Sequence, residues 1–168
     1  MTEIDNLARE AQRIEEDATF SSKSHYEAAS TWRKGYLWLG LPTAIIAAIS
    51  GVSAFQQYTL FAGIMAMLAA ALASISTFLD PSEKAQAHHT AGNRFTSLKN
   101  KARIYREIEL LEDQQQNQKE KLLQLSSERD AINEESPQIP RRAFEKARKG
   151  IEEGEAQYTV DAGQKNTS

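Results

Sequence analysis

The chain has 168 residues, a net charge of -3 and no cysteine, which fits one domain and excludes a disulfide framework and a thiolate metal site. Charged residues make up 26% of it, as in a soluble protein, but no Asp, Glu, Lys, Arg or His occurs from Gly35 to Leu79. That uncharged stretch starts too late and runs too long for a cleavable signal peptide. The two charged flanks and the uncharged centre therefore predict two environments in one chain.

Residues 3–34 are predicted to form the first helix. Apolar side chains recur there at alternating spacings of three and four, as on one face of a helix. They are Ile4, Leu7, Ala11, Ile14 and Ala18. The stripe is narrow, so we expect this helix to pack on a partner helix.

The uncharged stretch is long enough for two membrane-spanning helices, since each needs roughly 20 apolar residues. Its break at residues 56–59 predicts spans at 36–55 and 60–79, joined as an antiparallel hairpin. Pro42 falls early in the first span, where it predicts a kink or a late helix start. Aromatic side chains beside Arg33 and Lys34 suit a membrane interface. A soluble bundle with two buried central helices is the alternative.

Basic residues predict the orientation of the hairpin. Lys23, Arg33 and Lys34 precede it, and no acidic residue lies between Glu83 and Glu107 in the basic run that follows. The positive-inside rule places both flanks in the cytoplasm. We expect a multi-pass protein of the bacterial inner (plasma) membrane with both termini cytoplasmic.

The second flank begins with a helix-start signal at Asp80, Pro81 and Glu83. Asp is a favoured N-cap, Pro suits the first helical position, and Glu at the third can reach back. We predict a helix over 81–135, because apolar positions then follow a 4-3 repeat like a coiled-coil seam. The seam runs Ala91, Phe95, Leu98, Ala102, Tyr105, Ile108, Leu111, Gln115, Gln118, Leu122, Leu125, Arg129, Ile132. Gln115 and Gln118 predict a weak or bent middle.

Two prolines in residues 136–140 end that helix, and a short helix is predicted over 141–153 with Gly154 as its cap. Residues 157–168 read as a disordered tail. The predicted fold is all-α: a two-helix transmembrane hairpin continued by long cytoplasmic helices that form an antiparallel stalk, plus the short C-terminal helix. Residues 1–156 form the single domain.

No constellation for covalent chemistry is present, so we expect neither an enzyme nor a cofactor. His88 and His89 point about 100° apart on a helix and cannot share one metal ion. The basic run from Lys84 to Arg106 could bind lipid head groups or a nucleotide phosphate, or could only set topology. The candidate residues for such a phosphate are His88, His89, Arg94, Lys99 and Arg103.

Small residues recur on the predicted membrane helices, where they let helix backbones approach closely. Several such faces suggest packing between hairpins, hence a homo-oligomer in the lipid bilayer. The Ser and Thr hydroxyls could line a pore, or could bond only their own helix backbone. The candidate packing or pore-lining residues are Thr43, Ala47, Ser50, Gly51, Ala62, Ala66, Ala70, Ser74 and Thr77.

Taken together, these features resemble the SLATT domain family, two-transmembrane effector domains associated with SMODS nucleotidyltransferases and SLOG sensors. The resemblance covers nearly the whole chain. The residues that carry it are Tyr26, Trp32, Arg33 and Lys34, then Phe78, Leu79, Asp80, Pro81, Ala85, His88, Gly92, Phe95 and Leu98, and last Ile139 and Pro140.

The resemblance implies a pore-forming effector of bacterial anti-phage defence, acting by abortive infection and cell death. It also implies gating by a cyclic nucleotide or related signal, or by a separately encoded sensor protein. No nucleic-acid partner is expected. The alternative is a membrane-anchored helical scaffold or adaptor without pore activity.

Overall fold

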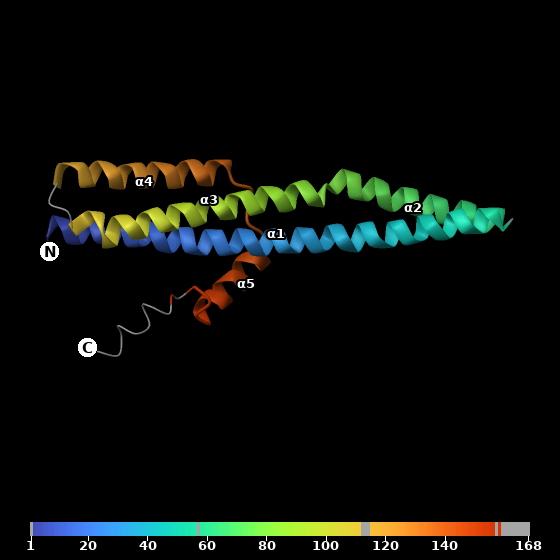
Figure 1. The fold of residues 1–168 in the computed structure, drawn as a ribbon, viewed down its shortest axis with the longest axis horizontal. Helices are drawn as coiled ribbons and strands as arrows, with labels where there is room; N and C mark the ends of the chain where they lie inside the picture. The colour runs from blue at the N-terminus through green and yellow to red at the C-terminus, as the bar shows by residue number, and fades with distance from the viewer. Residues whose placement is uncertain (1, 57, 112–114, 157, 159–168) are drawn as a thin grey trace. The chain divides into compact units, whose positions relative to one another are not determined.

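The computed structural model describes residues 2–56, 58–111, 115–156 and 158, and every element in these residues is helical (Figure 1). The elements are α1 (Glu3–Phe55), α2 (Thr59–Leu79), α3 (Pro81–Glu107), the 3-10 turn η1 (Glu109–Leu111), α4 (Gln115–Glu135) and α5 (Arg141–Glu152). The predicted all-α class is confirmed. The chain divides into two compact units: residues 1–28 with 87–168, here called the bundle, and residues 29–86, here called the hairpin.

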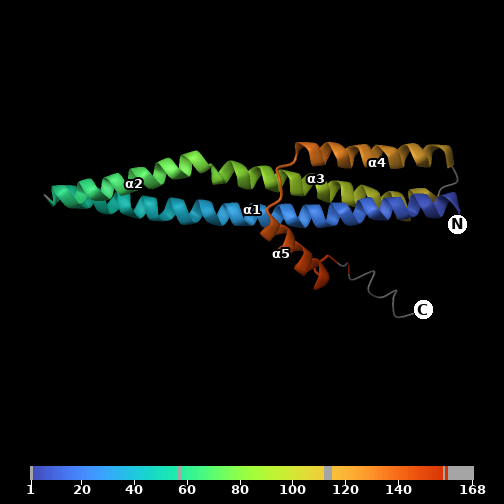
Figure 2. The same ribbon diagram turned by 180° about the vertical axis from the view of Figure 1, so that it is seen from behind.

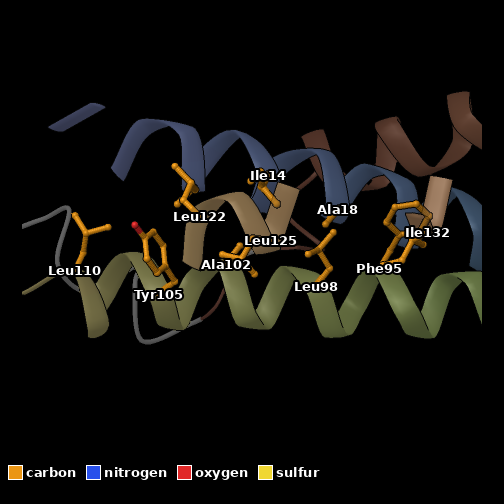
Figure 3. Packing of buried hydrophobic residues seen from close by; sticks show 11 residues of the cluster. Ile14, Ala18, Phe95, Leu98, Ala102, Tyr105, Leu110, Leu122, Leu125 and Ile132 are labelled. Carbon is orange, nitrogen blue, oxygen red and sulfur yellow. The ribbon is translucent and has the colours of Figure 1, made fainter. Parts of the chain in front are cut away.

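The bundle core lies between the first half of α1, α3 and α4 (Figure 3). Buried residues from α1 continue the predicted stripe, with Ile14 and Ala18 fully buried opposite Leu98 of α3. Two contacts show that α3 runs antiparallel to α1: Arg106 Nη2 lies 3.0 Å from Glu15 Oε2, and the Tyr26 hydroxyl lies 3.1 Å from Thr96 Oγ1. The members of the core are Ala11, Ile14, Ala18, Phe95, Leu98, Ala102, Tyr105, Leu110, Leu122, Leu125 and Ile132.

The single helix predicted over 81–135 is wrong: α3 ends at Glu107 and α4 runs back along it (Figure 2). Lys101 Nζ lies 2.8 Å from Glu128 Oε1, and the Tyr105 hydroxyl donates to the Gln118 carbonyl at 2.9 Å. The 4-3 repeat could not reveal this reversal, because two antiparallel helices that share a core carry the same spacing as one continuous helix.

Gln118 explains where the chain turns. Its side-chain amide donates to the carbonyls of Glu109 and Leu110 at 3.3 and 3.1 Å, and the residue is 4% exposed. Helix ends leave carbonyls without partners, and this amide satisfies two of them. The polar interruption in the repeat therefore marks the turn and not a weak middle. The side chains of Leu111 and Gln115 lie outside the described residues.

Helix α5 packs on α1 through small residues. Ala143, Ala147 and Gly150 are its buried positions. Ion pairs flank this contact, since Lys146 Nζ lies 2.6 Å from Glu27 Oε2. The helix ends at Glu152, one residue before the predicted end, and Gly154 follows with φ 93°, a left-handed conformation that glycine adopts readily. Of the tail predicted to be disordered, residues 157 and 159–168 lie outside the described residues.

The hairpin pairs residues 29–55 of α1 with α2. Helix α1 continues through Pro42, so the late helix start predicted as one possibility does not occur. The Ser50 hydroxyl donates to the Ala62 carbonyl at 2.8 Å across the two helices. Less exposed residues recur at a 3-4 spacing on both helices: Trp32, Gly35, Leu39, Thr43, Ile46, Ser50 and Ser53 on α1, and Ala62, Met65, Ala69, Leu72 and Ser76 on α2. Gly40 and Pro42 on α1 are also partly buried.

Asp80 both ends α2 and begins α3. Its own N–H donates to the Ser76 carbonyl at 3.1 Å, while its φ of 38° places it in the left-handed region. Its Oδ1 accepts the Glu83 N–H at 3.0 Å, and Pro81 is the first residue of α3. The predicted N-cap is confirmed.

Candidate functional site

Between Gly35 and Leu79, the outer surface of the hairpin carries no charge and is mostly apolar. Trp38, Phe55 and Phe78 are 79%, 91% and 90% exposed. Soluble monomers rarely expose continuous apolar patches larger than a few hundred Å². Both helices of the hairpin are long and apolar enough to cross a membrane. A bilayer is the environment in which this surface is stable.

The predicted small-residue faces divide into two groups. Ser50 and Ala62 lie in the contact between α1 and α2, together with Ala69, which was not among the predicted residues. The contact between the two helices follows a 3-4 spacing, which matches the 3.6 residues per turn of a helix. Residues spaced strictly by four rotate away from this contact with each step. Thr43 is half-buried, and the exposed group is Ala47, Gly51, Ala66, Ala70, Ser74 and Thr77.

Three of the predicted pore-lining hydroxyls are hydrogen-bonded within their own helices. Thr43 donates to the Leu39 carbonyl at 2.6 Å, Ser74 to Ala70 at 2.8 Å, and Thr77 to Ala73 at 3.0 Å. Such bonds to the carbonyl four residues earlier are the usual way to satisfy membrane hydroxyls. In this conformation the hydroxyl oxygens of Thr43, Ser74 and Thr77 are already hydrogen-bonded. Their outward-facing atoms are largely methyl and methylene carbons.

A buried histidine pair joins α1 to α3 within the bundle. The Nδ1 atoms of His25 and His88 lie 3.0 Å apart, and the residues are 1% and 4% exposed. The His25 ring also stacks on Phe95, with centroids 5.5 Å apart. One Nδ1 must donate to the other, so this contact requires at least one neutral ring.

Both histidines favour their neutral forms. Burial lowers the pKa of His25 to about 4, and the nearby charge of His88 adds to this effect. Burial also lowers the pKa of His88. A buried imidazolium would lack solvation, and two adjacent imidazolium ions would repel one another.

Tyr26 packs next to this pair, against the small residue Gly92. A methyl group added at Gly92 would lie 2.8 Å from the Tyr26 ring, so only glycine fits without a shift. The Tyr26 hydroxyl donates to Asn93 Oδ1 at 2.8 Å and lies 3.1 Å from Thr96 Oγ1. Its ring meets the exposed His89 edge-on, with centroids 5.7 Å apart.

This cluster includes His88, Gly92 and Phe95, which are among the residues that carry the sequence resemblance. Sequence reasoning missed their partner His25. The signal was available, because continuing the α1 stripe from Ala18 by four and then three residues reaches His25. Continuing the α3 stripe backward from Ala91 by three residues reaches His88 in the same way.

The predicted phosphate-binding residues do not form one site. His88 is buried against His25, and Arg94 is ion-paired with Glu135 of α4. Lys99 and Arg103 do come together: Lys99 Nζ and Arg103 Cζ lie 4.7 and 4.6 Å from the centroid of the Tyr158 ring. Among the described residues, no group of three or more His, Asp or Glu side chains is placed to hold a metal ion.

Two apolar helices joined by a short loop, together with a bundle of charged helices, define an all-α, two-span membrane protein. The chain belongs to the SMODS and SLOG-associating 2TM effector domain family 4, whose match covers residues 17–162. This match includes the hairpin and nearly all of the bundle, and it confirms the resemblance seen in the sequence. No curated protein and no solved structure matches the chain significantly.

Proposed function

We propose that this protein is a pore-forming membrane effector of a bacterial anti-phage defence system. The observation that carries the proposal is the hairpin surface, which exposes small residues separately from the contact between its own two helices. Ala66 and Ala70 are exposed in one copy, whereas Ala62 and Ala69 are buried. The membership in a two-transmembrane effector family supports the same function.

In this proposal, several hairpins assemble side by side. Without a hydrophobic driving force in lipid, membrane helices associate through close packing of small residues and through hydrogen bonds. The Ala66 and Ala70 face allows a neighbouring helix to approach closely. Ser74 and Thr77 lie along the same face and would border the water-filled path.

The proposed location is the bacterial inner membrane with both termini in the cytoplasm. Lys23, Arg33 and Lys34 precede the uncharged stretch of residues 35–79, and the basic run of α3 follows it. A nucleotide signal or a separately encoded partner protein would act on the cytoplasmic bundle. Opening would dissipate the membrane potential and kill the infected cell.

Inducible expression in bacteria with a membrane-potential dye tests the proposal. We expect loss of potential and growth arrest under the activating signal. Ala66→Leu and Ala70→Leu should abolish both by blocking close approach. Ala71→Leu is the matched control, because Ala71 lies on the face of large lipid-exposed residues that includes Leu68 and Ile75. Normal growth with a sustained potential during activation would refute pore formation.

A membrane-anchored scaffold is the second candidate. The bundle exposes Ile104 in the last turn of α3 and Ile108 directly after the helix, at 43% and 58%. A partner helix could pack on this pair. If the chain stays monomeric or dimeric in detergent and cells keep their potential, the scaffold is the better account.

A further inference from the structure

Three cations gather on one side of the bundle where α1 and α3 run antiparallel. The contact between Tyr26 and Thr96 lies at one end of this stretch, and the Arg106–Glu15 ion pair lies at the other. Between these two contacts, α1 carries Lys23, and α3 carries Lys99 and Arg103.

The chain covers these cations with two of its own residues, Glu155 and Tyr158, here called the C-terminal strap. Glu155 Oε2 lies 2.9 Å from Lys23 Nζ. The Tyr158 ring lies under Lys99 and Arg103 at 4.7 and 4.6 Å. Among the described residues, no carboxylate lies within ion-pair distance of either of these two cations.

The strap presents an anion and an aromatic ring, three residues apart, to three cations. A nucleotide presents the same two groups, a phosphate and a base. Lysine and arginine bind phosphate oxygens, and the planar guanidinium also stacks on aromatic rings. The contacts of the strap are weak, because the Glu155 side chain is 64% exposed and exposed ion pairs contribute little.

We propose that Lys23, Lys99 and Arg103 form a binding site for a nucleotide, and that the strap is a built-in competitor for it. The phosphate would replace the Glu155 carboxylate beside Lys23, and the base would replace the Tyr158 ring beside Lys99 and Arg103. This assignment deepens the proposed function, since it names the class of signal and the surface of the bundle that receives it.

Binding of a fluorescent nucleotide to the full-length protein in detergent tests the site directly. With mant-ATP as the probe and fluorescence polarisation as the readout, Glu155→Gln with Tyr158→Ala should tighten binding. We expect the Kd for mant-ATP to fall about three- to tenfold, because the variant loses one exposed ion pair and two exposed cation–π contacts that compete with the nucleotide. Lys99→Gln with Arg103→Gln should weaken binding at least about tenfold in either background, because both cations that contact the face of the base are lost.

Lys119→Gln with Arg141→Gln is the matched control, since it removes the same charge from exposed positions of α4 and α5. If this control weakens binding as much as the Lys99 and Arg103 variant, the attraction is general and the site is wrong. If the strap variant binds mant-ATP no better than the natural chain, the competitor role is wrong.

Competition separates a nucleotide from other sources of phosphate. Unlabelled AMP should displace the probe, whereas inorganic phosphate at the same concentration and phosphatidylglycerol in nanodiscs should not. If phosphate or the lipid displaced the probe as well as AMP does, the base would contribute nothing to binding. That result would overturn the assignment of the site to a nucleotide. Nucleotide binding is measured in detergent and does not depend on a pore. If the protein binds the nucleotide but does not change the membrane potential of cells, the proposed function is refuted and the binding site is not.

Discussion

The bundle and the hairpin differ in which side chains lie between their helices. The bundle buries large side chains completely, among them Phe95, Leu98 and Ile132. The hairpin buries Ala62 and Ala69 between its helices and turns its large side chains outward. The bundle is thus stabilised by removing large apolar side chains from water, whereas the hairpin is stabilised by close contact of its two helices.

The difference has a physical origin in the surrounding medium. In water, full burial of a Leu or Phe side chain stabilises a fold by about 1.5–3 kcal/mol. In lipid this gain vanishes, so helices associate by close approach of small residues and by bonds such as the one from Ser50 to the Ala62 carbonyl. Replacing large residues should therefore damage the bundle, and enlarging small residues should damage the hairpin.

The largest expected effect is in the bundle. Phe95→Ala should destabilise it by about 3–5 kcal/mol, because it leaves a cavity and removes the stack on His25. Unfolding in detergent followed by circular dichroism measures this loss. Phe78→Ala, at a hairpin position that is 90% exposed, is the comparison and should change little. Equal losses would break the proposed contrast between the two units.

The next effect should appear in the hairpin. Ala69→Leu should cost about 1–3 kcal/mol by forcing α1 and α2 apart. The chain has no cysteine, so a Ser50→Cys, Ala62→Cys pair reports the contact through its rate of disulfide cross-linking. Ala69→Leu should slow this cross-linking, and Ala71→Leu should not. Unchanged cross-linking with Leu at residue 69 would mean that Ala69 does not set the approach of the two helices.

Two glycines give a finer test of the same contrast. At Gly92 a methyl group would meet the Tyr26 ring, whereas at Gly63 nothing lies within 4 Å. Gly92→Ala should therefore lower bundle stability by a net of about 1 kcal/mol, the steric cost exceeding the gain in helix propensity. Gly63→Ala should leave the protein as stable or more so. The melting temperatures of the two variants, measured in parallel, test this difference. A higher melting temperature for Gly92→Ala would show that the Tyr26 ring moves aside at little cost.

The last prediction is a pH dependence that arises in the bundle. The folded-state pKa of His25 is lowered to about 4, whereas an unfolded His titrates near 6.5. The unfolded chain binds the proton first, so stability is fully present above about pH 6.5 and falls as the pH drops toward 4. Melting temperatures between pH 7 and pH 5 should fall, and less so in His25→Asn. His89→Gln, on the exposed ring, should keep the natural slope.

Sequence reasoning succeeded where a feature depends on nearby residues. The uncharged stretch after Gly35, the cap at Asp80 and the start of α5 at Arg141 all depend on composition or on neighbours within one helical turn. The predicted span 60–79 matches α2 to within one residue, and the predicted end of the first span at residue 55 is the end of α1, although α1 already begins at Glu3. The apolar run that hydrocarbon requires explains the match at these ends.

It failed where distant residues decide. A 4-3 repeat does not indicate whether a helix continues or whether the chain reverses direction. The reversal near Gln118 depends on its side-chain amide, which donates to the carbonyls of Glu109 and Leu110. The contact between Lys23 and Glu155 joins residues 132 positions apart, with no local pattern. His25 escaped notice because a polar residue interrupts an apolar stripe, although its spacing fits.

The hydroxyls of Thr43, Ser74 and Thr77 each donate to a carbonyl one turn earlier in their own helix. A rotation about χ1 moves such an oxygen to another staggered position without any change in the backbone. Facing hydrocarbon, the oxygen stays on its carbonyl, and facing water it can turn outward and gain a solvent partner. Rotation of three side chains, Thr43 on α1 and Ser74 and Thr77 on α2, can therefore change the polarity of the hairpin surface while both helices keep their registers.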